Sequence, residues 1–533
     1  MIYPISPGYL SISSSIKRVT VDHEMKPNTG FLSLAEELRV FILSFLPYRD
    51  ILHCTSICKA LRQTYLSSSE LQYIVELGGQ HLLPVSNTDN HTPISERLQL
   101  LRNKTHAWFK ADVNSFESFP IPFKKCTTSV SVANGHVYLW DQDDDTARII
   151  PLLLEPPQQT FQRYWSPGTL CSVPHSTNMD VFMDPAQDLI AVVYIVDHKT
   201  TYIDLKALSV DGVHPRAAGQ TMYLSGLPGH DDSEIHTVGL VLKGFGRHIA
   251  LQRSLSVEQG TSSDDMWQLQ IWDWQHSTTS NSALSGLMDP EYSTIFDFCF
   301  LGNNRLLAWI DDLRIYSIED MSQTPQLLAC FLMPIPLDET QFILPMDDIH
   351  QIQAQQSMYT SDPAHRILCI FAPRPASRVF IISTKVFFDL DGIAAATPIP
   401  WEDWGPSNTR IFDQPHFCGV YVCGNRVLQS FCVLGEFKLH AMDFSPLAVM
   451  NRRGLGRVVK EPSTIDVTDQ DFICDDFRPG DTLTTFLPYV DVVLDRTFRG
   501  APDIWIDEDR IYLFDPEEEQ TVEGTSTIEI IDV

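Results

Sequence analysis

The segment NGHVYLW, residues 134–140, introduces a pattern that the chain repeats: a turn, then Arg, His or Asp, then two or more apolar residues. The later copies are AQDLIAVV (186–193), GRHIALQ (246–252), NNRLLAW (303–309), AHRILCI (364–370), GNRVLQS (424–430) and DEDRIYLF (507–514). A turn that leads directly into an aliphatic or aromatic run is typical of a β-strand. The repeated segment therefore predicts a repetitive all-β region.

The spacing of these copies indicates the architecture. Their first aliphatic residues are Val137, Leu189, Ile249, Leu306, Ile367, Val427 and Ile511, which by subtraction are 52, 60, 57, 61, 60 and 84 residues apart. Periods of this size in an all-β region suggest a β-propeller with one blade of about four strands per repeat. LQIWDW, at 269–274, contains the Trp-Asp pair of propeller blades. We predict about seven blades rather than six or eight, with an insertion near residues 450–485; a run of ordinary antiparallel sheets is the alternative.

The N-terminal part has helical rather than strand periodicity. In LAEELRVFILSFLPYRDILHCTSICKALRQTY, residues 34–65, a helix drawn at 100° per residue has one broad apolar stripe, with Val40 and Leu43 on the opposite side. The stripe consists of Leu34, Leu38, Phe41, Ile42, Phe45 and Leu46. Pro47 separates this helix from a second one, which Asp50 is expected to cap. Because a unit of about 45 residues cannot bury so many apolar side chains within itself, we expect a partner protein or a following domain to cover some of them.

These patterns predict an α+β multidomain protein. Residues 1–29, rich in Ser, Pro and Gly, are expected to be disordered, and residues 30–77 to form a small all-α domain. Residues 78–114 are expected to form a helical linker containing the helix ISERLQLLRNKTHAWF (94–109), with Ser95 as its N-cap. Residues 115–533 are expected to form the large all-β domain.

The composition of the chain disfavours some classes of partner and indicates a cellular compartment. The chain has 38 basic and 68 acidic residues, a net charge of −30 that disfavours binding to nucleic acid or to anionic membranes. Its eleven cysteines include no CxxC pair, which indicates a reducing compartment. The N-terminus lacks the apolar core of a secretory signal, and no window approaches 18 uncharged apolar residues. We expect an intracellular protein, cytoplasmic or nuclear, without a membrane span.

Motifs for catalysis or metal binding are weak. The segment HDDSEIH offers His230, Asp231, Asp232, Glu234 and His236 as metal ligands, but its spacing favours a polar loop. DQDDD (141–145) lacks the glycine and the terminal glutamate of a calcium loop, so a hairpin tip is expected. His53, Cys54 and Cys58 lack an evident fourth ligand, so packing is favoured over a metal site. We predict no catalytic residue, no metal and no cofactor.

The helical segment resembles the F-box family. Leu34–Leu38 is similar to its Leu-Pro-x-Glu-Ile/Leu opening, Ile42–Leu46 to Ile-Phe-Ser-Tyr-Leu, Asp50–Leu52 to Asp-Leu-Leu, and Ile57–Arg62 to Val-Cys-Lys-x-Trp-Arg. The departures are Ala35 for proline, Arg39 for an apolar residue and Leu61 for tryptophan. SERLQLLRNKTHAW (95–108) and WEDWGPSNTRIF (401–412) resemble segments of the F-box family expanded in mushroom-forming fungi.

This resemblance implies a non-enzymatic substrate receptor of an SCF-type cullin–RING ubiquitin ligase. The F-box would bind a Skp-type adaptor, and the all-β domain would bind a target protein that the sequence does not identify. The residues expected to form the F-box core and the adaptor interface are Leu34, Leu38, Ile42, Leu46, Leu52, Ile57, Cys58 and Leu61. The alternatives are an adaptor-independent scaffold with a degenerate F-box, and a propeller enzyme with a polar central channel, which metal analysis with His230→Ala and His236→Ala would test.

Overall fold

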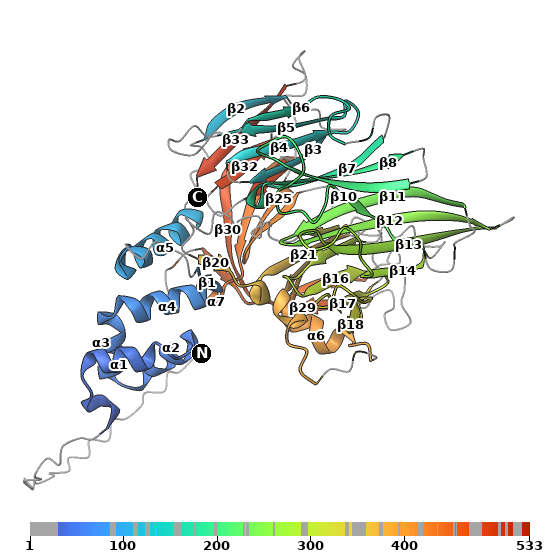
Figure 1. The fold of residues 1–533 in the computed structure, drawn as a ribbon. Helices are drawn as coiled ribbons and strands as arrows, with labels where there is room; N and C mark the ends of the chain where they lie inside the picture. The colour runs from blue at the N-terminus through green and yellow to red at the C-terminus, as the bar shows by residue number, and fades with distance from the viewer. Residues whose placement is uncertain are drawn as a thin grey trace, which may run out of the picture. The chain divides into compact units, whose positions relative to one another are not determined.

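The structure is a computed structural model of the 533-residue chain (Figure 1). It describes residues 30–85, 92–109, 116–122, 128–133, 135–152, 162–171, 173, 177–196, 200–227, 230, 234–259, 262–288, 297–335, 341–343, 359–372, 377–392, 395, 397–413, 419–433, 435–450, 454, 456–467, 482–498, 503–506, 510–514 and 525–532. The segment predicted to be disordered, 1–29, lies outside these residues. The chain divides into two compact units, Met1–Leu71 and Gln72–Val533.

The first unit is helical. Its elements are η1 (Phe31–Ser33), α1 (Glu36–Leu43), α2 (Tyr48–Ile57) and α3 (Lys59–Ser67), and α3 contacts both α1 and α2. Glu36 and Glu37 lie in the first turn of α1, where carboxylates are favoured by the helix dipole. The prediction that Asp50 caps α2 is wrong, because Pro47 precedes the helix and Asp50 lies in its first turn. Proline suits this boundary because its missing N–H would have no partner there.

The second unit begins within a helix and continues as a propeller. Its helices are α4 (Ser69–Gly79, which starts in the first unit), α5 (Ile94–Phe109), α6 (Trp401–Asn408) and α7 (Pro446–Val449). Short 3₁₀ helices occur at η2 (Pro185–Gln187), η5 (Pro363–His365) and η6 (Thr384–Phe387). The helix predicted over 94–109 is confirmed as α5, but Ser95 lies inside it rather than at its N-cap.

Seven antiparallel sheets form the blades in the described part of this unit. Blades 1 to 3 are β3 (Thr128–Ala133), β4 (His136–Asp141), β5 (Thr146–Pro151) and β6 (Arg163–Trp165); β7 (Thr177–Asp184), β8 (Leu189–Val196), β9 (Thr200–Ala207) and β10 (Thr221–Tyr223); and β11 (Glu234–Phe245), β12 (His248–Gln259), β13 (Ser262–Asp273) and β14 (Ala283–Leu287). Blades 4 and 5 are β15 (Asp297–Phe300), β16 (Arg305–Trp309), β17 (Leu313–Ser317) and β18 (Gln326–Phe331); and β19 (Gln341–Ile343), β21 (Ile367–Ala372), β22 (Arg378–Ser383) and β23 (Thr409–Asp413).

The last two blades contain the insertion and the closure of the ring. Blade 6 is β24 (Val420–Cys423), β25 (Arg426–Val433), β26 (Glu436–Asp443) and β30 (Tyr489–Phe498), with β27 (Arg457–Val459) added at its edge. Blade 7 is β31 (Asp503–Ile506), β32 (Arg510–Phe514) and β33 (Thr525–Asp532), completed by β2 (Glu117–Pro122) from the start of the propeller. Figure 1 shows β2 beside β33, and the pairing of Pro122 with Thr525 ties the two ends of the propeller together.

Apolar clusters between successive blades confirm the ring. One cluster joins each pair: blades 7 and 1, 1 and 2, 2 and 3, 3 and 4, 4 and 5, 5 and 6, and 6 and 7. Both faces of a blade are therefore buried, which explains why strands such as β8, LIAVVYIV, are almost continuously apolar. The prediction of a seven-bladed propeller is confirmed.

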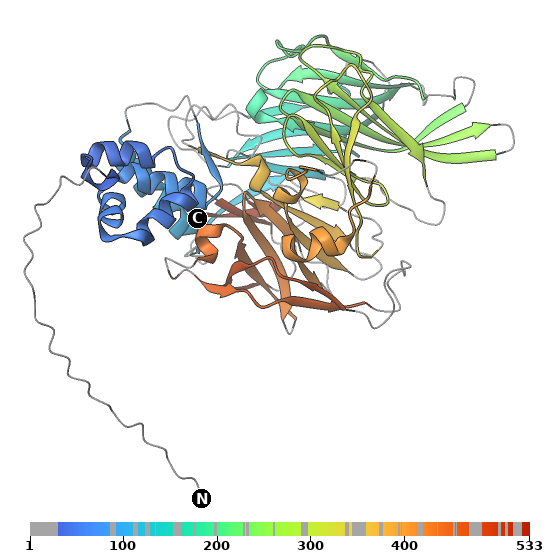
Figure 2. The same ribbon diagram turned by 90° about the horizontal axis from the view of Figure 1, so that it is seen from below.

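Two features depart from a uniform ring. The three inner strands of blade 3 are each 12 residues long, and Figure 2 shows them reaching farther out than their neighbours. Between β26 and β30 the chain inserts α7, β27 and the two-stranded sheet of β28 (Ser463–Asp466) and β29 (Thr482–Thr485). This insertion accounts for the 84-residue step and agrees with the predicted one near 450–485.

Candidate functional site: the apolar surface of the N-terminal helices

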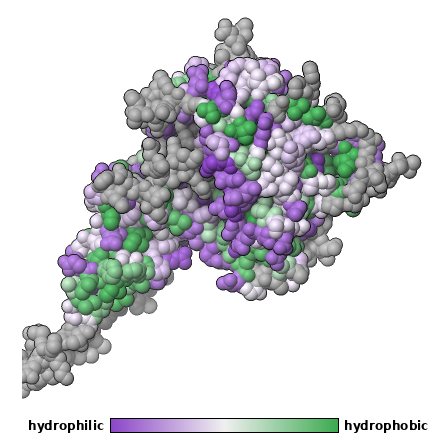
Figure 3. Space-filling view, viewed as in Figure 1, coloured by the Kyte–Doolittle hydropathy of each residue, from purple (hydrophilic) through white to green (hydrophobic). Residues whose placement is uncertain are grey.

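Helix α1 exposes a row of large apolar side chains. Leu38 is 51% exposed, Phe41 59%, Ile42 43% and Phe45, just beyond the helix, 73%. The rings of Phe41 and Phe45 meet edge to face with their centroids 4.9 Å apart. We call these four residues the α1 surface. In the space-filling view, apolar residues gather over the N-terminal helices (Figure 3).

The buried side of α1 is the one that lies opposite the broad apolar stripe. Leu43 is 4% exposed, whereas the members of the broad stripe that form the α1 surface are exposed. The unit therefore closes its interior with the narrower apolar side, together with Ile51, Leu52 and Leu61, and leaves the broader one to solvent. Large exposed apolar patches of this kind mark sites of protein association.

The structure distributes the eight predicted interface residues over three environments. Leu38, Ile42 and Ile57 are exposed; Leu34, Leu46 and Cys58 are half-buried; Leu52 and Leu61 are buried. Phe41 and Phe45 were absent from that set, although the stripe contains both of them. Their side chains could have been recognised from their size, since aromatic residues are enriched at the centres of protein interfaces.

A groove beside the α1 surface is bordered by acidic side chains. It is lined by Glu36, Glu37, Val40, Phe41, Ser67, Ser68 and Glu70. The Ser67 hydroxyl donates a hydrogen bond to the Glu36 carboxylate, which joins the end of α3 to the start of α1. The groove therefore combines an apolar wall with carboxylates, an arrangement that favours a partner with basic groups around an apolar centre.

The segment at 401–412 packs into the propeller core. Trp401 and Trp404 of α6 are buried in the core between blades 4 and 5, and the Trp404 indole N–H donates to the carbonyl of Leu332 over 3.1 Å. A Cβ on Gly405 would lie 2.3 Å from the Trp401 ring, so only glycine allows this helix turn to approach the indole. Trp401, Trp404 and Gly405 therefore contribute to the packing between blades 4 and 5.

Carboxylates tie the inner strands of the propeller together. Asp180 accepts a hydrogen bond from the Leu242 N–H over 2.8 Å, and Asp297 accepts one from the Phe342 N–H over 2.7 Å. Lys243 forms an ion pair with Asp297, which links blade 3 to blade 4. Burial raises the pKa of Asp180, while the N–H groups bonded to it act in the opposite direction. These contacts place the carboxylates in structural roles between blades.

The metal alternatives find no support among the described residues, where no group of three or more His, Cys, Asp and Glu side chains could hold a metal ion. Asp231 and Asp232 of HDDSEIH lie outside the described part. Asp141–Asp145 forms a hairpin tip between β4 and β5, as expected. Within the described residues, Cys54 and Cys58 form no disulfide. Within the described residues no helix is long and apolar enough to cross a membrane.

Comparison with known proteins gives only distant structural likeness. No family model and no curated protein matches this chain. Similar solved structures include an uncharacterized protein from Listeria monocytogenes (10% identity, TM-score 0.32, 62% of this chain and 83% of that one). They also include the C-terminal WD40 domain of Sif2 (11%, 0.27, 58% and 80%) and a nidogen/laminin complex (11%, 0.23, 60% and 89%). The propeller assignment rests on the strand order and the interblade cores of this chain.

Proposed function

We propose that the protein is the substrate-recognition subunit of an SCF-type cullin–RING ubiquitin ligase. The N-terminal helices would bind a Skp-type adaptor through the α1 surface, and the propeller would bind the target. The observation that carries this proposal is the exposure of Leu38, Phe41, Ile42 and Phe45 within a segment whose residue order resembles the F-box.

The α1 surface is large enough to contribute substantially to an interface. Covering its four side chains would remove on the order of 400 Å² of apolar area from water, a gross gain of about 10 kcal/mol. Association itself costs about 4–15 kcal/mol, so this surface would need support from neighbouring contacts. Ile57 of α2 and Leu66 of α3 are also exposed and can extend it. An adaptor interface of ordinary size, about 1,200–2,000 Å², would include them.

Such a receptor acts by proximity and needs no catalytic residue of its own. A target held on the propeller brings its lysines near the charged conjugating enzyme, which raises their effective concentration. Within this proposal, the hydrogen bonds that Asp180 and Asp297 accept between blades stiffen the ring. A stiff ring loses little conformational entropy when the target binds.

The test is an adaptor pull-down with the full-length chain. The double variant Leu38→Asp, Ile42→Asp should reduce adaptor binding at least a hundredfold, because placing a charge in an apolar interface costs several kcal/mol. Since both side chains are exposed, circular dichroism and thermal unfolding should remain close to those of the wild type. Val238→Asp and Leu287→Asp in blade 3 are matched controls, being exposed apolar residues outside the helices.

The outcomes separate the proposal from its main alternative. If wild type binds the adaptor and brings down cullin while the double variant does neither, the proposal holds. If a folded wild-type chain fails to bind any Skp-type adaptor, the proposal fails and the adaptor-independent scaffold replaces it. Equal binding by wild type and double variant would show that the α1 surface is not part of the adaptor interface.

A further inference from the structure

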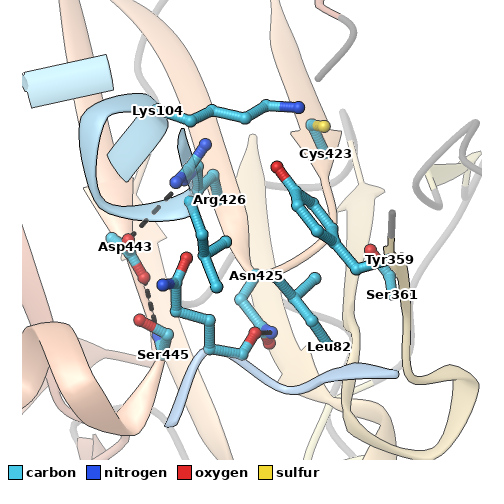
Figure 4. Close-up of a pocket in the computed structure, with 12 residues that line it drawn as sticks. Leu82, Lys104, Tyr359, Ser361, Cys423, Asn425, Arg426, Asp443 and Ser445 are labelled. Carbon is cyan, nitrogen blue, oxygen red and sulfur yellow. Dashed lines mark hydrogen bonds and ion pairs between the residues drawn. The ribbon is translucent and has the colours of Figure 1, made fainter. Parts of the chain in front are cut away.

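A small pocket lies where the helices of the second unit meet the propeller. Helix α5 inserts Trp108 into the core between blades 6 and 7, and the Asn425 amide donates to the carbonyl of Gln80 over 3.2 Å. Strand β1 (Leu82–Pro84) pairs with β20 (Tyr359–Ser361). The pocket between these contacts has a volume of about 50 Å³. Lys104, Tyr359, Asn425, Arg426 and Asp443 are among the residues that line it (Figure 4).

Arg426 is fixed on two sides and leaves its terminal nitrogens for a ligand. Its guanidinium lies 5.1 Å from the centre of the Trp108 ring, and its Nε is 3.7 Å from the Asp443 carboxylate. Asp443 is in turn held by the Ser445 N–H over 2.7 Å. Within the described part of the chain, the Arg426 guanidinium forms an ion pair with Asp443 and makes no hydrogen bond within 3.5 Å. An arginine positioned in this way presents a rigid pair of donors to an oxyanion.

Two further donors converge on the same space. The Lys104 ammonium lies 5.4 Å from the centre of the Tyr359 ring. Figure 4 shows the Tyr359 hydroxyl directed into the space between the Arg426 guanidinium and the end of Lys104. The three donors come from different elements, α5, the start of β25 and β20. Their convergence brings two positive charges into a pocket lined by one carboxylate, in a chain whose net charge is −30.

The pocket has room for a small anion. A water molecule needs roughly 10–15 Å³ measured in the same way, so about 50 Å³ accommodates about four water-sized groups. This volume admits a tetrahedral oxyanion, whose four oxygens can accept hydrogen bonds from several donors at once. Ammonium, guanidinium and phenol groups are all donors that suit a phosphate oxygen.

We propose that this pocket binds a tetrahedral oxyanion, either inorganic phosphate or the phosphate group of a small monoester. The bound anion would bridge α5 to β20 and to blade 6 through Lys104, Tyr359 and Arg426, and would stabilise the junction between the helices and the propeller. This site is independent of the α1 surface and does not depend on the proposed adaptor function.

The experiment is isothermal titration of the full-length chain with inorganic phosphate and, separately, glycerol phosphate, at constant ionic strength. The two titrants separate the free ion from the monoester as the source of the phosphate. We expect saturable one-site binding, and a melting temperature that rises by about 1–2 °C at ten times the Kd. Lys104→Gln should raise the Kd at least tenfold, because it removes a charged donor. Tyr359→Phe keeps the ring and removes only the hydroxyl, and should raise the Kd several-fold.

Lys385→Gln is the matched control, because this lysine lies on the surface beside Asp389 and away from the pocket. Its Kd should equal that of the wild type. If Lys104→Gln does not fold, Tyr359→Phe alone provides the test. The proposal is overturned if wild type shows no saturable binding at millimolar phosphate. It is also overturned if the pocket variants bind as the wild type does, or if chloride at equal ionic strength gives the same stabilisation.

Discussion

Replacing His248 by phenylalanine should make the propeller less sensitive to acid. His248 is 0% exposed at the start of β12, and within the described structure neither of its ring nitrogens has a hydrogen-bond partner. Its ring stacks on Phe300, with centroids 6.1 Å apart and planes at 17°. Burial, together with the charge of Arg247, lowers the pKa of His248 to about 4, although the nearby Asp273 acts to raise it. The folded protein therefore holds a neutral histidine at neutral pH.

The sign and size of the effect follow from linkage. An unfolded histidine has a pKa of about 6.5, so below that pH the unfolded chain binds a proton that the folded chain does not. Stability is therefore lost as the pH falls from about 6.5 towards 4. Between pH 7.5 and pH 5 the loss due to this residue is about 2 kcal/mol. His248→Phe removes the titrating group and keeps a ring against Phe300. The unfolding free energy of this variant should therefore not show the loss between pH 7.5 and pH 5 that His248 causes.

Urea or thermal unfolding of both proteins at pH 7.5 and pH 5 provides the measurement. The stability of the variant relative to wild type should increase by about 2 kcal/mol on going to pH 5, which is about 2 °C in melting temperature if the second unit unfolds cooperatively. His53→Asn changes an exposed histidine in the first unit and serves as the control. If wild type and His248→Phe lose stability in parallel over this range, His248 is protonated or solvated in the folded state, and the reasoning is refuted.

Three further substitutions test the packing described above. Trp108→Ala should destabilise the second unit by about 3–5 kcal/mol because it empties the core between blades 6 and 7, whereas Leu100→Ala on the exposed side of the same helix should change the denaturation midpoint little. Gly405→Ala should cost about 1–3 kcal/mol through its clash with Trp401, while Gly226→Ala, where a Cβ meets nothing within 4 Å, should not reproduce that loss in melting temperature. Ala35→Pro should be tolerated or stabilising by about 0.4–1 kcal/mol in thermal unfolding, because the Ala35 backbone already has φ −55° and ψ 150°.

The propeller could be predicted from the sequence because its signal is local. All seven aliphatic residues that marked the repeat, from Val137 to Ile511, lie in the second strand of their blades, at or near its start. Two buried faces make these strands continuously apolar, and the preceding turn residues separate them clearly. The regular steps of about 60 residues then reveal the number of blades.

Long-range contacts could not be predicted from the repeated sequence pattern. The pairing of β2 with β33 joins the two ends of the propeller, and nothing in the segment ESFPIP identifies its partner. The pocket at the helix–propeller junction likewise brings together Lys104, Tyr359 and Arg426, which are far apart in sequence. Each of these residues occurs in a context typical of an ordinary surface or turn position, so only the fold shows that their side chains converge.

The orientation of α1 could not be read from periodicity, because the helix is apolar on two sides. Periodicity locates both sides but does not decide which one is buried, and the broader stripe was the natural candidate for the interior. The structure buries Leu43 and exposes Phe41 and Phe45. A broad apolar surface left in solvent is costly for a protein that acts alone, which is why its exposure is the strongest argument for a partner.

The departures from the F-box pattern bear on the fold of the helices rather than on this surface. Ala35 already has backbone angles that proline adopts, and Leu34 before it is extended, as a residue preceding proline must be. Leu61, in place of tryptophan, is buried and belongs to the interior of the unit. Neither position contributes a side chain to the α1 surface. If Leu38→Asp with Ile42→Asp abolishes adaptor binding while Ala35→Pro leaves it unchanged, the residues that determine recruitment are the exposed ones, and the two departures are variations in how the helices are stabilised.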